Sequence, residues 1–259
     1  SQAMAILSSN AQAFQTDGYK QQTFTFTAMF QHQLHGFYAS GSGGARSLSQ
    51  GVSLVSMGYD MSQGGIKKSG PLNAAIKGPG FFILEGSIVE RYVLTRASDF
   101  IFSANGTLCD IFGRKVKGYR IVDGTVDQSV LVDIKLDTTV TISDVRIQEE
   151  GMIYSSAGED TQPVYQLAMA RVSNASQMAQ VQGNAFRPTI NSGPITAYGV
   201  SGDPLFGQVS GGFSESSNVN PAELTIMGIQ LQRGYQAIQA ALTMSNRFLT
   251  QLMDVAGKA

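Results

Sequence analysis

Two histidines are the side chains in this sequence best placed to hold a metal ion. His32 and His35 stand three residues apart, so on a helix they would share one face. The cysteine and acidic residues that usually complete such a site do not occur close to them in the sequence. We therefore expect no metal site and no bound cofactor.

Carboxylate pairs and glycine-rich turns are the other candidate groups for chemistry. Glu149-Glu150 and the pair Asp123/Asp127 could serve as general acid and base, but no pattern places them in a pocket. Gly78-Pro79-Gly80 and residues 41–44 lack the spacing and the Lys-Ser/Thr ending of phosphate-binding loops. We interpret all of these as solvated loop positions, turns or linker, and expect no catalysis.

The composition describes a surface that is polar but nearly uncharged. Only 14% of the 259 residues are charged, against about 25% in typical domains, and the formal net charge is -1. This balance does not provide the excess positive charge that binds nucleic acid or an anionic membrane. It suits a subunit that packs against copies of itself. The single Cys109 cannot form an intrachain disulfide, and neither a membrane span nor a Sec-type signal is visible.

The first part of the chain predicts a helix, a turn and a strand. Helix-favouring residues run from Ser1 to about Phe14 and stop at the turn 16–18. Alternating Thr and Phe over residues 23–27 predict a strand, and the glycine-rich and serine-rich residues 39–45 predict a linker.

Residues 51–212 have the pattern of a β-rich region, with short apolar runs separated by glycine and Asn/Asp turns. Asn105-Gly106 is the strongest hairpin signal. The segment 164–172 fits a strand or a helix, and we favour a strand. Other strands are expected at 81–84, 88–94, 130–134 and 139–142.

A long helix is predicted from Pro221 to about Ala256, with Asn220 as its cap and Glu223 completing a capping box. Its apolar residues recur at heptad spacing, and its other faces are rich in Gln. At about 50 Å it is too long for a small β domain to cover, although an ordinary amphipathic helix folded onto its own domain stays an alternative. We expect subunit contacts through Leu224, Met227, Leu231, Tyr235, Ile238, Leu242, Phe248, Leu249 and Leu252.

Four segments, in order along the chain, resemble the bacterial flagellar basal-body rod and hook protein family, the flagellar axial proteins. They are residues 9–20, 51–82, 94–119 and 216–237, whereas residues 121–210 match only in general β character. The residues that match the family's motifs are Asn10, Thr16, Gly18, Tyr19, Lys20, Gly78, Gly80, Phe81, Phe82, Asn218, Asn220 and Pro221.

The resemblance implies an α+β fold. Paired N-terminal and C-terminal helices would form a coiled-coil-like inner layer, and a β-rich middle domain would form the outer layer. We accordingly divide the chain into an N-terminal helix with its following segment, a linker and extended segment, a β-rich domain and a C-terminal helix. These parts are residues 1–40, 41–70, 71–212 and 213–259.

The resemblance also implies a structural subunit that self-assembles into a helical tube and transmits torque. Its location would be the flagellar basal body, reached from the cytoplasm by type III export to the periplasm or cell exterior. The implied partners are copies of itself, other rod and hook proteins, ring proteins of the wall and outer membrane, and the export apparatus, with no nucleic acid.

Three points stay open from the sequence. A hook subunit would share the fold, but hook subunits carry an additional outer β domain for which this chain has little room, so rod is favoured. A secreted β-rich enzyme such as a wall hydrolase is an alternative that no motif supports. Relatives carry more N-terminal helix, so either the inner helical layer is incomplete or the chain is trimmed.

Overall fold

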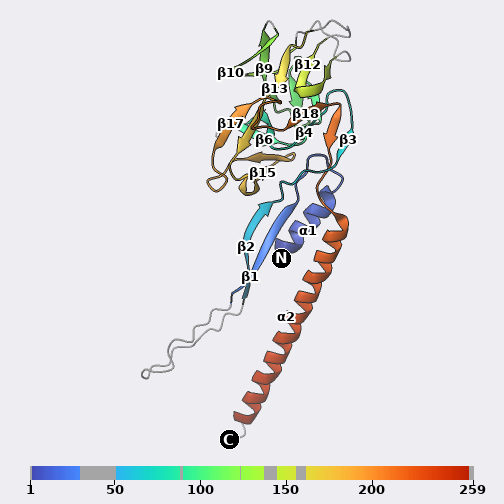
Figure 1. Ribbon diagram of the computed structural model, residues 1–259. Coiled ribbons are helices and arrows are strands. Elements are labelled where there is room, and N and C mark those ends of the chain that lie inside the picture. Colours follow the sequence, from blue (N-terminus) through green and yellow to red (C-terminus); the bar gives the residue numbers. More distant parts are fainter. Residues whose placement is uncertain are drawn as a thin grey trace, which may run out of the picture. The chain divides into compact units, whose positions relative to one another are not determined.

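The computed structural model describes residues 2–29, 51–87, 90–122, 124–136, 145–155 and 162–256 (Figure 1). Within these ranges the side chains of residues 25–29, 51–56, 245, 248–249 and 252–256 are not described. The predicted linker at 39–45, both histidines, Asp123 and the predicted strand at 139–142 lie outside the description.

A helix at each end and a β-rich middle make this an α+β protein, as predicted. The chain forms two compact units, which we call the helical unit (residues 1–14 and 219–259) and the β unit (residues 15–218). The four-part division made from the sequence stays a prediction.

The helical unit contains α1 (Gln2–Ala13) and α2 (Pro221–Ala256), and both helices confirm the sequence prediction. The Asn220 side chain caps α2, because its Oδ1 accepts the Ala222 N–H at 3.0 Å. Glu223 contacts the cap as expected, but its Oε1 accepts from the Asn220 side-chain amide at 3.2 Å, whereas a capping box uses the backbone N–H.

Helix α1 lies alongside the first turns of α2 (Figure 1). Leu7 and Leu224 are buried, and together with Ala11, Phe14 and Gly228 they line a groove of about 490 Å³ between the two helices. Only the beginning of α2 contacts α1 in this way, since α1 has 12 residues and α2 has 36.

A six-stranded antiparallel sheet is the centre of the β unit. Its strands follow the order β15 (Ala179–Val181), β16 (Ala185–Arg187), β6 (Tyr92–Thr95), β5 (Phe81–Glu85), β14 (Met169–Val172) and β17 (Ile195–Gly199). Strand β5 is buried on both faces: Phe82 and Leu84 belong to one hydrophobic core, and Phe81 and Ile83 to the other. This explains the continuous apolar run in its sequence.

A five-stranded antiparallel sheet has the order β10 (Thr125–Asp133), β9 (Lys117–Val122), β13 (Tyr165–Leu167), β12 (Met152–Tyr154) and β11 (Arg146–Ile147). The strand favoured at 164–172 is confirmed as two strands, β13 and β14, that separate at Ala168 and join different sheets. The strand expected at 130–134 is longer than predicted, because β10 begins at Thr125. Of the run 88–94, the described part is a strand only from Tyr92.

Four two-stranded sheets complete the strands of the β unit. The pairs are β1 (Gln22–Met29) with β2 (Gly51–Tyr59), β3 (Ile66–Lys68) with β19 (Phe213–Glu215), β4 (Ala74–Lys77) with β18 (Gln208–Gly211), and β7 (Phe100–Phe102) with β8 (Leu108–Asp110). Strand β1 confirms the Thr/Phe prediction, and Asn105-Gly106 lies in the β7–β8 hairpin with Gly106 at a φ of 75°. Two short 3-10 helices, η2 (Glu149–Gly151) and η3 (Ala175–Gln177), lie between strands.

Candidate subunit interface and motif cluster

The predicted interface residues of α2 pass from buried to exposed along the helix. Leu224 is buried, Met227 and Leu231 are half-buried, and Ile238 and Leu242 are exposed, Leu242 to 59%. Tyr235 is also exposed, whereas the side chains of Phe248, Leu249 and Leu252 lie outside the description. The apolar row therefore continues on the helix surface beyond the turns that α1 contacts.

A second group of exposed apolar side chains on α2 was missed by the sequence interpretation. Ile226, Ile229 and Met244 are exposed, and at about 100° per residue they lie roughly opposite Leu231 and Leu242. Ile226 and Met244 are 18 residues apart, which is about five helical turns and places them on one face. The spacing of these three residues was visible in the sequence, but the heptad rows considered there lie on the other face of the helix.

The surface of α2 carries very few charges. Its 36 residues include only Glu223, Arg233, Arg247 and Asp254 as charged side chains. Neutral amides such as those of the many Gln residues can be buried at far smaller cost than ions if they are hydrogen-bonded. The helix is therefore suited to contacts on more than one side.

The family-motif residues of the N-terminal segment meet those before α2 at one place in the β unit. Gly18 donates its N–H to the Glu215 carbonyl oxygen at 2.7 Å, and the Asn218 N–H donates to the Tyr19 carbonyl oxygen at 3.4 Å. Gly18 has a φ of 69°, and a Cβ there would lie 2.4 Å from the Ala97 nitrogen. Only glycine fits this position without strain.

A buried carboxylate with two cations lies at the centre of this meeting point. Glu215 Oε1 is 2.6 Å from Lys20 Nζ and also accepts the Gly64 N–H at 2.9 Å. Glu215 Oε2 is 3.2 Å from Arg96 Nη1. The exposed fractions of the three charged side chains are 1% for Lys20, 6% for Arg96 and 0% for Glu215.

Further bonds hold the two cations in place. Lys20 Nζ donates to the Ser62 carbonyl oxygen at 2.6 Å, and Arg96 Nη2 donates to the Gly78 carbonyl oxygen at 2.7 Å. Burial lowers the pKa of Lys20, and the nearby Glu215 opposes that shift. Burial likewise lowers the pKa of Arg96, again against Glu215. The carboxylate is thus the group that offsets the burial of both cations.

The motif residues at 78–82 support the same region. The Arg96 guanidinium carbon lies 5.1 Å from the centre of the Phe81 ring, a cation–π arrangement. Gly80 has a φ of 125°, and a Cβ there would lie 2.6 Å from Met169 Cε. Gly78-Pro79-Gly80 joins β4 to β5, which confirms its interpretation as a turn.

Asn218 ties three segments together with its side chain. Its Oδ1 accepts the Gln21 N–H at 2.8 Å. Its Nδ2 donates to the Asp60 carbonyl oxygen at 2.8 Å and contacts the Ser62 carbonyl oxygen at 3.2 Å. Of the remaining motif residues, Asn10 is buried in α1, and Asn220 and Pro221 begin α2.

Glu215 is the central residue of this cluster that the sequence interpretation missed. It is separated from Lys20 by 195 positions, so no local spacing links the two charges. The available signal was its isolation, since it is the only charged residue between Asp203 and Glu223. Arg96 was part of a matched segment but was not assigned to a site.

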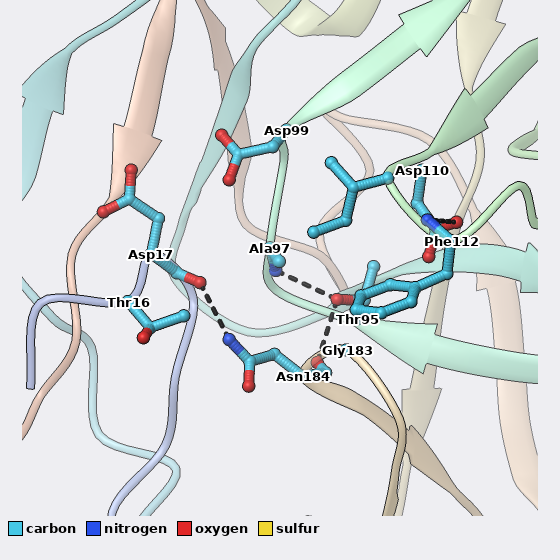
Figure 2. A pocket seen from close by; sticks show the side chains of 10 residues that line it. Thr16, Asp17, Thr95, Ala97, Asp99, Asp110, Phe112, Gly183 and Asn184 are labelled. Atoms are coloured by element: carbon cyan, nitrogen blue, oxygen red, sulfur yellow. Dashed lines mark hydrogen bonds between the residues drawn. The ribbon is translucent and has the colours of Figure 1, made fainter. Parts of the chain in front are cut away.

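A cavity of about 230 Å³ in the β unit brings three carboxylates together (Figure 2). Asp17 pairs with Lys67 at 2.7 Å, Asp110 pairs with Arg114, and Asp99 accepts from the Asn73 amide at 2.9 Å. Burial raises the pKa of Asp99, and the nearby Asp17 adds to the rise. The cavity is lined by Thr16, Asp17, Thr95, Ala97, Asp99, Asp110, Ile111, Phe112, Gly183 and Asn184.

The structure gives these carboxylates structural partners. Figure 2 shows Asn184 reaching the backbone of Asp17, where its Nδ2 donates to the carbonyl oxygen at 3.1 Å. Among the described residues, no three His, Cys, Asp or Glu side chains are grouped so that they could hold a metal ion. None of the helices in this part of the chain is both long and apolar enough to span a membrane.

The described members of the carboxylate pairs weighed from the sequence are exposed. Glu149 and Glu150 are exposed in η2, and Glu150 has a φ of 59°. Asp127 is exposed but lies within strand β10, so its interpretation as a loop residue is wrong. Its carboxylate accepts from the Ser129 hydroxyl and backbone N–H, and these bonds lower its pKa.

Comparison with known proteins shows similarity to flagellar rod and hook proteins. A family model described as "Flagellar basal body rod FlgEFG protein C-terminal" matches residues 210–255. The chain is 27% identical over 258 residues to the flagellar basal-body rod protein FlgG of Bacillus subtilis, covering 96% of this chain and 92% of that protein. The chain is thus similar to a flagellar basal-body rod protein along nearly its whole length. The flagellar basal-body rod protein FlgG of Buchnera aphidicola subsp. Schizaphis graminum is also 27% identical, covering 97% of this chain and 93% of that protein.

Hook proteins of the family match a smaller part of the chain. The flagellar hook protein FlgE of Helicobacter pylori is 31% identical over 115 residues, which is 44% of this chain and 16% of that protein. The region matched by the family model includes Glu215, Asn218 and nearly all of α2. The buried carboxylate and the exposed helix therefore both lie in the region that the family model matches.

Proposed function

We propose that this protein is a structural subunit of the bacterial flagellar axial structure, located in the basal-body rod. It self-assembles into a helical tube and transmits torque. The observation that carries this proposal is α2, a helix of 36 residues with few charges and with exposed apolar side chains between Ile226 and Met244. The similarity to rod proteins along nearly the whole chain supports it.

Helix α2 supplies the driving force for assembly. Full burial of an exposed Leu or Ile side chain contributes about 1.5–3 kcal/mol, so covering Ile238 and Leu242 in a neighbouring subunit would stabilise a contact substantially. Ile226 and Met244 offer a second contact on the opposite face. The proposed interface residues are Leu224, Met227, Leu231, Tyr235, Ile238, Leu242, Phe248, Leu249 and Leu252.

The inner layer of the tube is built from paired terminal helices. Within the helical unit, α1 packs along the first turns of α2, and this contact supports coiled-coil-like pairing. The apolar groove between α1 and α2 would be filled by a helix of an adjacent subunit. The β-rich domain, assigned to residues 71–212, would form the outer layer.

A rod subunit fits better than a hook subunit. Rod proteins match nearly the full length of both chains, whereas the hook protein match covers only a minor part of that protein. The proposed partners are copies of this chain and other rod and hook proteins. Ring proteins of the wall and outer membrane and the flagellar export apparatus are further proposed partners, the latter carrying the subunit from the cytoplasm to the periplasm or cell exterior.

A mechanical role also fits the family, whose members are structural. The three carboxylates around the 230 Å³ cavity all have partners within the described residues, so the cavity offers no observation in favour of a wall hydrolase. We propose that the chain does no catalysis.

A charge placed in the apolar row of α2 tests this function. We expect Leu242→Asp, expressed in cells that lack the native copy, to stop basal-body assembly, because assembly would bury an unpaired carboxylate. Gln232→Asp is the matched control, since Gln232 is exposed and, at about 100° per residue, lies between the two apolar faces of the helix. Electron microscopy of purified basal bodies and swimming assays provide the readout.

The two variants together show whether assembly uses the apolar row of α2. Loss of rods with Leu242→Asp and normal rods with Gln232→Asp support assembly through the apolar row. Normal rods with both variants contradict it. Circular dichroism of each purified variant must show an intact β signal, so that failure to assemble is separated from failure to fold.

A further inference from the structure

Three segments of the β unit meet around Glu215 and Asn218, and we call their meeting point the junction. The entry segment is residues 15–21, the middle segment is residues 60–65, and the exit segment is residues 213–218. The entry segment leads into the β unit from α1, and the exit segment leads out of it toward α2. Both chain connections of the β unit therefore pass through one place.

Backbone hydrogen bonds connect the three segments pairwise. The Gly18 N–H donates to the Glu215 carbonyl oxygen at 2.7 Å, which joins entry and exit. The Asp60 N–H donates to the Gln21 carbonyl oxygen at 2.9 Å, which joins middle and entry. The Ser216 N–H donates to the Gly65 carbonyl oxygen at 2.7 Å, which joins exit and middle. A Cβ on Gly64 would lie 1.9 Å from the Ser216 carbonyl oxygen, so the backbones are in close contact.

The charges inside the junction do not balance. Lys20 and Arg96 contribute two positive charges and Glu215 one negative charge, so the buried group has a formal charge of +1. Arg96 Nε is buried and has no hydrogen-bond partner among the residues that the structure describes. Asp60 also attracts Lys20, but it is exposed and therefore screened by water. Among the described residues, Glu215 is the buried anion that compensates the two cations.

The junction contacts one core of the sheets but is held mainly by polar interactions. Met61 of the middle segment packs against that core, and Arg96 lies over its Phe81 ring. We expect the sheets to stay folded when the ion cluster opens, because Phe82 and Phe186 are fully buried within them. Regions held by few apolar contacts can open locally while the rest of a domain stays folded.

We propose that Glu215 acts as the latch of the junction. Its carboxylate holds the entry, middle and exit segments together as one cooperative element, and this element can open while the sheets remain folded. Opening releases both chain connections of the β unit together, because the same carboxylate binds Lys20 of the entry segment and the Gly64 N–H of the middle segment. This inference goes beyond the proposed function and does not depend on assembly.

Hydrogen exchange of the purified full chain, at concentrations where sedimentation shows a monomer, tests the latch. In Glu215→Gln the two cations lose their buried anion, and we expect exchange of the Gly18, Gln21 and Gly64 amides to become about tenfold faster or more. Amides of β5 and β14 should keep their wild-type exchange rates. Glu85→Gln is the matched control, because Glu85 is a carboxylate of β5 that is 40% exposed and pairs with Lys115.

A double variant separates charge balance from packing. The buried charge is +1 in the wild type, +2 in Glu215→Gln, 0 in Lys20→Met and again +1 in the double variant. We therefore expect Lys20→Met to open the junction less than Glu215→Gln does, and to reverse part of the opening when added to Glu215→Gln. If side-chain packing alone mattered, the two changes would loosen the junction additively.

Two results would contradict the proposal that Glu215 holds the junction closed. One is wild-type exchange at Gly18, Gln21 and Gly64 in Glu215→Gln, and the other is more opening in the double variant than in Glu215→Gln. If Glu215→Gln alone does not fold, Lys20→Met is compared with the double variant. The latch then requires faster junction exchange in the double variant, and equal exchange contradicts it.

Discussion

Two leucines show how differently the two units of this protein are built. Leu84 in the β unit is 0% exposed, whereas Leu242 on α2 is 59% exposed. In the β unit, apolar side chains fill two cores, and even the buried charges have partners. In the part of the chain that the structure describes, the apolar row of α2 from Ile238 to Leu242 is exposed. The β unit thus buries its own apolar side chains, whereas under the proposed function a neighbouring subunit covers those of the helix.

Replacing each of the two leucines with alanine tests this difference in burial, and it has the largest expected effect on stability. We expect Leu84→Ala to lower the free energy of unfolding by about 2–5 kcal/mol, because it leaves a cavity in a packed core. Leu242→Ala should change the stability of the monomer by at most about 0.5 kcal/mol, since little is buried there. Urea unfolding of both variants, followed by circular dichroism, measures the difference.

A large loss of stability in Leu242→Ala would contradict the claim that Leu242 contributes little to the stability of the monomer. It would mean that the apolar row of α2 is covered within its own chain, as in an ordinary amphipathic helix. Leu84→Ala then serves as the reference for what a fully buried leucine contributes.

Two adjacent glycines test how closely the backbones of the junction are packed within the β unit. The expected effect on stability is smaller. A Cβ on Gly64 would meet the Ser216 carbonyl oxygen at 1.9 Å, whereas a Cβ on Gly65 would have nothing within 4 Å. Gly64→Ala should therefore destabilise by about 1–3 kcal/mol, as overpacking does. Gly65→Ala is the control, and we expect it to melt close to the wild type in a thermal unfolding experiment. Equal melting of the two variants would show that the junction has room to adjust.

Elements specified by neighbouring residues could be predicted from the sequence. Helix α2 begins at Pro221 because Asn220 can cap it, and its apolar pattern continues to Ala256. The β7–β8 hairpin follows from Asn105-Gly106, since Gly106 supplies the positive φ of the turn. The sequence left 164–172 open between helix and strand because its residue preferences conflict, and pairing with two different sheets decided it.

The junction could not be predicted, because it depends on topology. Lys20 and Glu215 are far apart in the sequence, and the exit segment is placed by the pairing of β19 with β3 and by the backbone bond from Gly18 to Glu215. The motif match singled out Lys20 and Asn218 without giving a reason for either. The structure supplies the reason for both: Lys20 binds the buried carboxylate, and Asn218 ties the three segments.

The most direct test of whether α2 drives assembly compares the full chain with a chain that ends at Asn218. Analytical sedimentation over a range of concentrations, with electron microscopy of the same samples, measures self-association. We predict concentration-dependent polymers for the full chain, and a folded monomer for the shortened chain, which retains the complete β unit. Polymers that persist after α2 is removed would contradict the claim that this helix drives assembly.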